Sequence, residues 1–203
     1  MILTKIEMSV SDPAVRAALR DAQKMHRLAS GLFQVAREDV HLLYRVRTEG
    51  TLVSLYLYAD RPIERERLLP GMSLAGERDL EDWLDSMQNG RILGFELMTM
   101  PFKKTAGGNN KNSRRRVLRT QEERLAWLAR KAEQNGFVIL EALESPGERI
   151  SASHSSEKGG QLFLDSFRYT GVLRITDAQT FRKAIRNGIG PGKSYGLGML
   201  LLK

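Results

Sequence analysis

Acid–base chemistry near neutral pH points to histidine, because imidazole is the side chain whose ordinary pKa lies closest to that range. The chain has three histidines, His26, His41 and His154, and no cysteine. The lack of cysteine excludes disulfides, thiolate zinc sites and cysteine nucleophiles, and so few histidines argue against a histidine-rich metal site. His26 is the most informative of the three, because it departs from the pattern of its own helix.

The helix that carries His26 is predicted to begin after Ser11-Asp12-Pro13, which supplies a cap and a proline at the first helical position. On a continuous helix His26 lies in the apolar stripe beside Ala22 and Ala29, as a buried, hydrogen-bonded core residue. That is the commoner outcome for a lone histidine. A catalytic role requires the helix to bend or break within about residues 21–31, and periodicity does not decide between the two.

The opposite side of this helix is a basic ridge formed by Arg16, Arg20, Lys24 and Arg27. A solvated helix face is the ordinary explanation of such a ridge. Contact with a polyanion is the alternative.

A second candidate for chemistry is the glycine-rich stretch at residues 188–198, which contains five glycines and Lys193. Such a run permits close approach of the backbone, and amide groups beside one cation suit a phosphate. The spacing is one residue short of a P-loop, and a terminal strand follows instead of a helix, which argues against a nucleotide-triphosphatase. We expect the loop to lie against a nucleic-acid backbone, with a flexible turn before the last strand as the alternative.

Residues 103–119 form the third candidate, with seven Lys or Arg and no acidic residue. The segment has no apolar periodicity, so we expect a loop or a disordered arm. Like charges this dense repel one another unless a polyanion neutralises them. RNA contact is therefore favoured over a solvated linker.

The whole chain is basic, with a net charge of +8 and a pI near 9.9, which is consistent with a polyanionic partner. Its 203 residues can form one domain or two small ones. No apolar run is long enough to span a bilayer and no signal peptide is evident, so we expect no membrane association. Together with the lack of cysteine, this indicates a cytoplasmic protein.

The elements that must position these candidates follow one order twice. Strands are expected at residues 2–8, 41–47, 52–58 and 91–98, with a hairpin turn at 48–51. In the second half, Thr120 and Glu123 form a capping box that opens a helix, and Asn135-Gly136 ends it. Further strands are expected at 137–143, 161–175 and 197–202, with a hairpin tip at 145–160 and a helix after Asp177.

We therefore predict an α+β fold of two tandem ferredoxin-like (RRM-like) domains. The first, residues 1–89, has the order β-α-β-β-(α)-β and carries the His26 helix. The second, residues 90–203, has the order β-α-β-β-α-β with the basic loop 103–119 and the glycine-rich loop 188–198. Two such units with basic loops favour an RNA-binding platform over a hydrolase pocket, although a fold alone does not establish a function.

Several of these features, in this order, resemble the CasE-type CRISPR endoribonucleases of type I-E systems. They are Met25-His26-Arg27, the strand at 91–101 with its basic loop, the Trp127-containing helix and the glycine-rich ending with Lys193. The resemblance implies a metal-independent, cofactor-free ribonuclease that cuts CRISPR precursor RNA at the 3′ base of a repeat hairpin. Attack by the RNA 2′-OH would give 2′,3′-cyclic phosphate and 5′-OH ends.

Under this resemblance His26 transfers a proton, and nearby cations stabilise the charge on the pentavalent phosphate. The expected catalytic residues are His26, Lys24, Arg27 and Lys158. Charge and backbone access give the expected RNA-binding residues Arg16, Arg20, Lys103, Lys104, Lys111, Arg114, Arg115, Arg116, Gly190, Gly192 and Lys193. The implied partners are the repeat RNA hairpin and other Cascade subunits, and the free protein is expected to be a monomer.

One position departs from the family pattern: Gln23 stands where the family commonly has tyrosine, and an amide cannot act as a base. Either another group fills that role, or the rate is modest. A non-catalytic RNA-hairpin-binding subunit with a buried His26 is the alternative.

Overall fold

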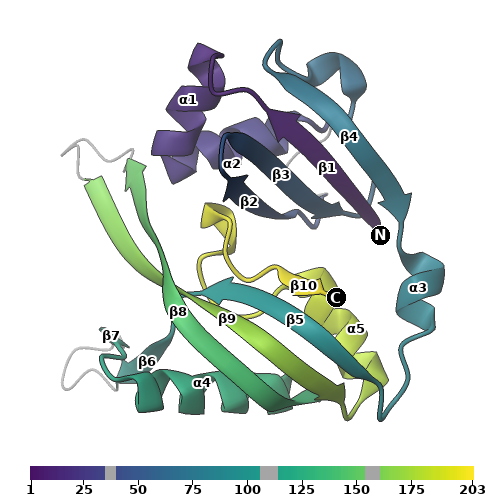
Figure 1. Ribbon diagram of the computed structural model, residues 1–203, viewed down its shortest axis with the longest axis vertical. Helices are drawn as coiled ribbons and strands as arrows, with labels where there is room; N and C mark the ends of the chain where they lie inside the picture. The colour runs from purple at the N-terminus through teal and green to yellow at the C-terminus, as the bar shows by residue number, and fades with distance from the viewer. Residues whose placement is uncertain (35–39, 106–113, 154–160) are drawn as a thin grey trace.

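The computed structural model describes residues 1–34, 40–105, 114–153 and 161–203. Within these ranges the chain forms two four-stranded antiparallel sheets of orders β2-β3-β1-β4 and β10-β5-β9-β8, one above the other in Figure 1. In each sheet the first strand lies between the third and the fourth, which is the ferredoxin-like arrangement. The prediction of two tandem ferredoxin-like domains is confirmed.

The first sheet contains β1 (Ile2–Met8), β2 (Leu43–Glu49), β3 (Leu52–Ala59) and β4 (Met72–Asp79). The helices around it are α1 (Pro13–Arg20), α2 (Ala22–Gly31) and α3 (Glu81–Asp85). A single 3-10 turn, η2 (Arg65–Arg67), stands where the second helix of the repeat would be. The first unit is thus a reduced copy of the second.

The helix that carries His26 is broken at Asp21, which answers the question that periodicity left open. Asp12 is the N-cap of α1, and its carboxylate accepts hydrogen bonds from the Ala14 and Val15 amides. Pro13 occupies the first helical position. Asp21 then adopts an extended conformation (φ −143°, ψ 111°), and its carboxylate caps α2 by accepting the Gln23 amide at 2.9 Å. The break lies at the edge of the interval that a catalytic His26 requires.

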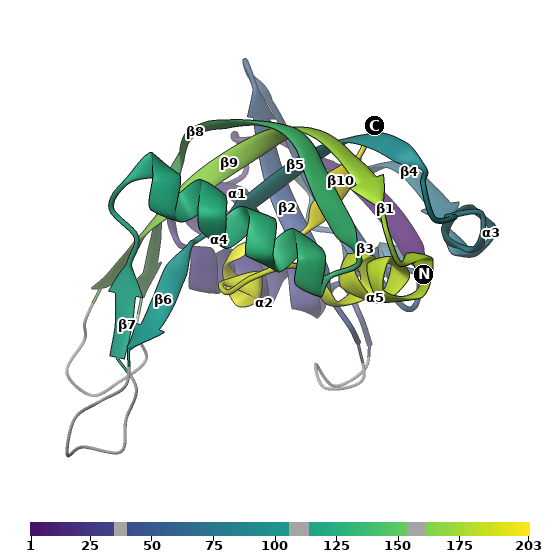
Figure 2. The same cartoon turned by 90° about the horizontal axis from the view of Figure 1, so that it is seen from below.

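The second sheet contains β5 (Ile92–Thr99), β8 (Phe137–Ser153), β9 (Gln161–Ile175) and β10 (Leu200–Leu202). Its helices are α4 (Gln121–Gln134) and α5 (Ala178–Asn187), which both lie on the same side of the sheet in Figure 2. A short 3-10 turn, η3 (Lys193–Tyr195), precedes β10.

Three expectations about this half were wrong in extent. The basic segment is not all loop, because β6 (Phe102–Thr105) and β7 (Arg114–Val117) form an antiparallel hairpin at its ends. Strand β8 continues to Ser153, so the expected tip at 145–160 is mostly strand. Strand β10 begins at Leu200 because the glycine-rich loop runs on to residue 198.

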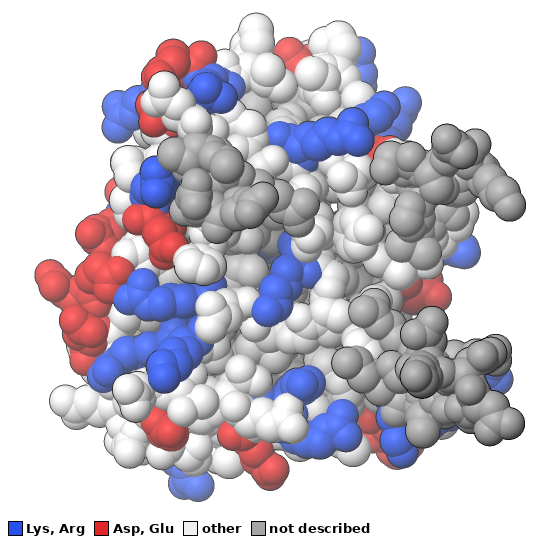
Figure 3. All heavy atoms as spheres, turned by 180° about the vertical axis from the view of Figure 1, so that it is seen from behind, with Lys and Arg blue, Asp and Glu red and all other residues white. Residues whose placement is uncertain are grey.

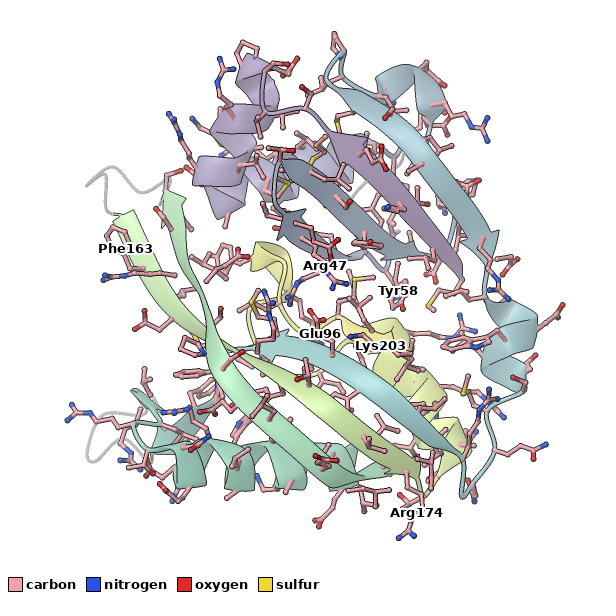
Figure 4. The ribbon with its side chains drawn as sticks, viewed as in Figure 1. Arg47, Tyr58, Glu96, Phe163, Arg174 and Lys203 are labelled. Carbon is pink, nitrogen blue, oxygen red and sulfur yellow. The ribbon has the colours of Figure 1, made fainter. Side chains whose placement is uncertain are left out.

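The two domains share an apolar core and polar links. Leu43 and Tyr58 of the first sheet belong to the same buried cluster as Leu97 and Leu200 of the second. Between the sheets, Arg45 donates to Glu96 at 3.1 Å, and both side chains are buried. Figure 4 shows Tyr58 of the first sheet and Glu96 of the second on opposite sides of this space. The relative position of the two domains is therefore held by packing and by a buried ion pair.

The boundary proposed at residue 89 falls between the sheets, since β4 ends at Asp79 and β5 begins at Ile92. In the described part of the chain, no helix combines the length and the apolar character that crossing a membrane demands.

Candidate functional site

His26 and Lys193 line the same cleft, although they come from different domains. The cleft has a volume of about 600 Å³ and lies where α2 and the segment before β2 meet the end of α5 and η3. Its walls comprise His26, Ser30, Phe33, Val40, His41, Leu42, Leu43, Arg186, Asn187, Lys193 and Ser194. The N-terminal imidazole and the C-terminal glycine-rich loop thus converge.

The His26 ring is largely buried, with 7% of the residue exposed. One side of the ring packs near Tyr44 of β2, with 6.0 Å between the ring centroids and a tilt of 30°. The Tyr44 hydroxyl donates to the Ser194 carbonyl at 2.9 Å and lies 3.4 Å from the Ala22 carbonyl. Tyr44 therefore joins the helix that bears His26 to the turn that bears Lys193.

Lys193 opens η3 directly after Gly192, whose φ of +83° lies in the left-handed region. Its side chain is partly buried. Burial holds the pKa of the Lys193 ammonium below its usual value, and the positive charge of Lys131 on α4 lowers that pKa further. A desolvated cation near a second cation gains strongly from an arriving phosphate.

The glycines of the loop are required by the protein's own packing. Gly190 has a φ of +83°, and a Cβ there would lie 2.5 Å from Thr99 Oγ1 and 3.0 Å from the Trp127 ring. At Gly196 (φ +76°) a Cβ would lie 3.0 Å from the Tyr44 ring. Amides along the loop also donate within the protein, such as Gly198 to the Met98 carbonyl at 2.8 Å. The loop is therefore held in a fixed conformation by the rest of the protein, and this conformation positions Lys193. RNA contact by Gly190 and Gly192 stays a prediction.

The structure does not bring Lys24 and Arg27 to this cleft. Both side chains are exposed along a separate groove between α1, α2 and η2. The physical reason is the helical period, which turns residues 24 and 27 away from the direction of residue 26. The remaining expected catalytic cation, Lys158, lies outside the described residues.

The other cations of the expected basic ridge take different places. Arg16 is exposed, and its guanidinium donates to the Val10 and Ser11 carbonyls at 2.9 and 2.7 Å, which ties it to the start of α1. Arg20 is exposed at a hollow between the domains. Neither lines the cleft of His26 and Lys193.

The β6–β7 hairpin concentrates positive charge. Its register sets Lys103 opposite Arg116 and Lys104 opposite Arg115, with Arg114 opposite Thr105. Like charges directly opposed on a ladder, as those of Lys103 and Arg116 are, destabilise it, so the hairpin gains from a polyanion. Arg116 also donates to Glu123 at 2.6 Å, which attaches β7 to the first turn of α4. Lys111 lies outside the described residues.

Sequence reasoning missed four residues of the site: His41, Tyr44, Lys131 and Arg186. The Arg186 guanidinium lines the cleft and is held by Glu81, which also binds the chain's N-terminal ammonium. These contacts hold the pKa of Glu81 down at about 2. Each of the four depends on pairing between distant segments, for which one sequence carries no local signal.

Figure 3 shows the face on which α2 and α5 lie, with Lys and Arg side chains spread over both domains. Among the described residues, no three His, Asp or Glu side chains gather as a metal site would require.

A family model described as "CRISPR associated protein" matches residues 1–203. The chain belongs to this family. The resemblance to CasE-type proteins, drawn from the ordered motifs, is confirmed.

Two curated members of the CRISPR-associated family resemble the chain in sequence. The chain is 27% identical over 211 residues to the CRISPR-associated endoribonuclease Cse3 of Thermus thermophilus, covering 98% of each chain. It is 32% identical over 124 residues to the CRISPR system Cascade subunit CasE of Escherichia coli, covering 57% of this chain and 60% of that one.

Solved structures of CRISPR-associated proteins share the fold over the full chain. A structure of CRISPR endoribonuclease Cse3 bound to a 19-nucleotide RNA superposes with a TM-score of 0.86 at 25% identity, with complete coverage of both chains. A chain of a CRISPR RNA-guided surveillance complex matches with a TM-score of 0.73 at 27% identity, covering 100% of this chain and 99% of that one.

Proposed function

We propose that this protein is the endoribonuclease that cuts CRISPR precursor RNA at the base of a repeat hairpin and retains the processed RNA within a Cascade complex. The names and bound RNA of its relatives support the substrate class. The observation that carries the proposal for this chain is the cleft shared by His26 and Lys193. It brings a proton-transfer group and a cation to one cleft, and the ring nitrogens of His26, which are buried in the free protein, must become accessible when the RNA binds.

The proposed reaction uses the RNA's own 2′-OH as nucleophile and needs no metal. The 2′ oxygen attacks the scissile phosphorus in line, the bond to the 5′ oxygen breaks, and the products are a 2′,3′-cyclic phosphate and a 5′-OH. His26 takes part in proton transfer, and Lys193 stabilises the negative charge of the phosphorane. The proposal leaves Lys24 and Arg27 out of this site, because their side chains line another groove.

Hairpin recognition is assigned to the β6–β7 hairpin, whose cations are opposed in register. Phosphate contacts of this kind supply affinity and position the stem without reading its sequence.

The test is cleavage of a hairpin-containing repeat RNA in EDTA, by the wild-type protein and by His26→Ala. We expect the wild type to cut once at the hairpin base, and the new 5′ end to accept phosphate from a polynucleotide kinase without prior dephosphorylation. His26→Ala should bind the RNA normally and lose about 100-fold or more in rate. If the wild type binds the RNA tightly and leaves it intact, the proposal that the protein is an endoribonuclease is wrong.

A non-catalytic hairpin-binding subunit is the second candidate. It is favoured by the 7% exposure of His26 and by Gln23 in place of the family's usual tyrosine. It predicts tight binding of the cognate hairpin and no product at any time.

A further inference from the structure

Gln23 leaves the proposed reaction one proton-transfer group short. Cleavage by the 2′-OH requires one group to remove the proton of the nucleophile and another to protonate the leaving 5′ oxygen. His26 can serve one of these steps, and the amide of Gln23 can serve neither. The inference below rests on the proposed function and concerns the residue that fills the vacant role.

His41 lines the same cleft as His26 and Lys193, so a second imidazole lies at the proposed reaction centre. It stands two residues before β2, at the mouth of the cleft, where 72% of its side chain is exposed. Substrate can therefore reach the ring without rearrangement of the core.

Asp60, which follows β3, fixes the orientation of this ring. The Nδ1 atom of His41 lies 2.6 Å from Oδ2 of Asp60. Because a carboxylate can only accept, Nδ1 carries the proton of this bond. The neutral ring then presents the lone pair of Nε2, as in the histidine–aspartate pairs of serine hydrolases, where the carboxylate sets the tautomer of the base.

The other charged groups at the cleft complete the arrangement. Arg186 lines the cleft from the end of α5, and its guanidinium donates a hydrogen bond to Glu81. The bond to Glu81 raises the pKa of this guanidinium, and the negative charge of Asp60 raises it further. Lys193 brings the second cation, from η3. Two imidazoles, one oriented by a carboxylate, and two cations thus line one cleft of about 600 Å³, which is large enough for a ribose-phosphate linkage.

We propose that His41 is the general base of the cleavage reaction and that Asp60 is its positioning residue. Nε2 of neutral His41 removes the proton of the 2′-OH as O2′ bonds to phosphorus. The bond from phosphorus to O5′ breaks, its electron pair stays on O5′, and that oxygen takes a proton from protonated His26. The two rings exchange protonation states, and proton exchange with water restores both.

An exposed histidine–aspartate pair on a protein surface contributes little to folding stability. A structural role for His41 and Asp60 therefore predicts no effect on RNA cleavage. A catalytic role predicts a large effect on rate with none on stability.

The experiment measures single-turnover cleavage of the repeat hairpin by the full-length protein. His41→Asn is the sharpest variant, because the asparagine amide can keep the bond to Asp60 while Nε2 is lost. We expect its rate to fall about 100-fold or more, with RNA affinity and melting temperature unchanged. Asp60→Asn should slow cleavage as well. Glu49→Gln is the matched control, since it removes the carboxylate of another exposed pair of the same domain, Arg47–Glu49 at 2.7 Å.

Two further measurements distinguish a general-base role of His41 from a purely structural one. Free imidazole added to His41→Gly should restore part of the rate, which a merely structural loss would not allow. An RNA with sulfur in place of the leaving 5′ oxygen needs no general acid. On this substrate His41→Asn should stay slow, whereas His26→Ala should recover.

Wild-type rates for His41→Asn would overturn the inference and leave the proposed function intact. Recovery of His41→Asn on the sulfur substrate would overturn the assignment as base. A loss of affinity that accounts for the whole defect would make His41 a binding residue and also overturn the inference. Absence of cleavage by the wild type would refute the proposed function itself.

Discussion

At the scale of single residues, Lys193 is the cation on which the proposed chemistry depends. Burial and the neighbouring charge of Lys131 hold its pKa below the usual value, so its ammonium is poorly compensated before RNA arrives. A phosphorane beside it supplies the missing counter-charge, and this stabilisation is larger in the transition state than in the bound substrate.

Replacing this charge should therefore lower the rate more than the affinity. We expect Lys193→Met to reduce single-turnover cleavage by about 100-fold, with a small change in the dissociation constant. Lys24→Met is the informative comparison, because this lysine of α2 is exposed in another groove and should cut at the wild-type rate. If Lys24→Met cut more slowly than Lys193→Met, the catalytic cation would be Lys24 of α2 and not Lys193.

Part of this site could be predicted from residue types. A lone imidazole and a glycine-rich loop with one lysine indicated proton transfer and phosphate contact, and the structure places both at one cleft. The partnership of His41 with Asp60 was not predicted, because it depends on the register of the β2–β3 hairpin, which pairs Leu43 with Tyr58 and so sets the residues before β2 beside those after β3. Periodicity could not show that the helix breaks at Asp21, since both flanks continue an apolar stripe.

At the scale of elements, the site forms where α2 contacts η3, and Tyr44 links the two through hydrogen bonds. The tyrosine is buried, its ring lies near His26, and its hydroxyl donates to the carbonyl of Ser194, next to Lys193. The left-handed conformation of Gly196 lets the loop approach the same ring. Element type and order were predictable from the sequence, but this contact joins residues 150 positions apart.

Loss of the Tyr44 hydroxyl should loosen η3 relative to α2. We expect Tyr44→Phe to cut about 10-fold more slowly, since one hydrogen bond contributes about 1 kcal/mol, and to accelerate amide hydrogen exchange across η3. In a His26→Ala background the same change should add no further defect.

Tyr58→Phe is the matched control for this prediction. Tyr58 is also a buried tyrosine whose hydroxyl lies near a carbonyl of the other domain, that of Leu200 at 3.5 Å, but it does not line the cleft. Equal losses of rate in the two variants would show that the effect comes from domain contact in general.

At the scale of the whole molecule, the cleft exists because two repeats of one fold are held in a fixed relation. Apolar side chains of both sheets share one buried cluster, and the Arg45–Glu96 pair between the sheets is buried as well. Burial lowers the pKa of the Arg45 guanidinium, and the charge of Glu96 opposes that shift. Such a pair gives little net stability relative to apolar residues, yet losing one partner leaves a buried charge uncompensated.

We therefore expect the Arg45–Glu96 pair to fix the orientation of one domain relative to the other. We expect Glu96→Gln to lower the free energy of unfolding by about 3 kcal/mol, measured by denaturant titration, and to slow RNA cleavage because α2 and η3 separate. The double variant Arg45→Met with Glu96→Met should regain most of the stability, because neither charge is then buried alone. Glu49→Gln, which breaks an exposed pair, should cost less than about 1 kcal/mol. If the double variant regains stability but not cleavage, the ion pair sets the geometry of the cleft; if it regains both, packing alone is sufficient.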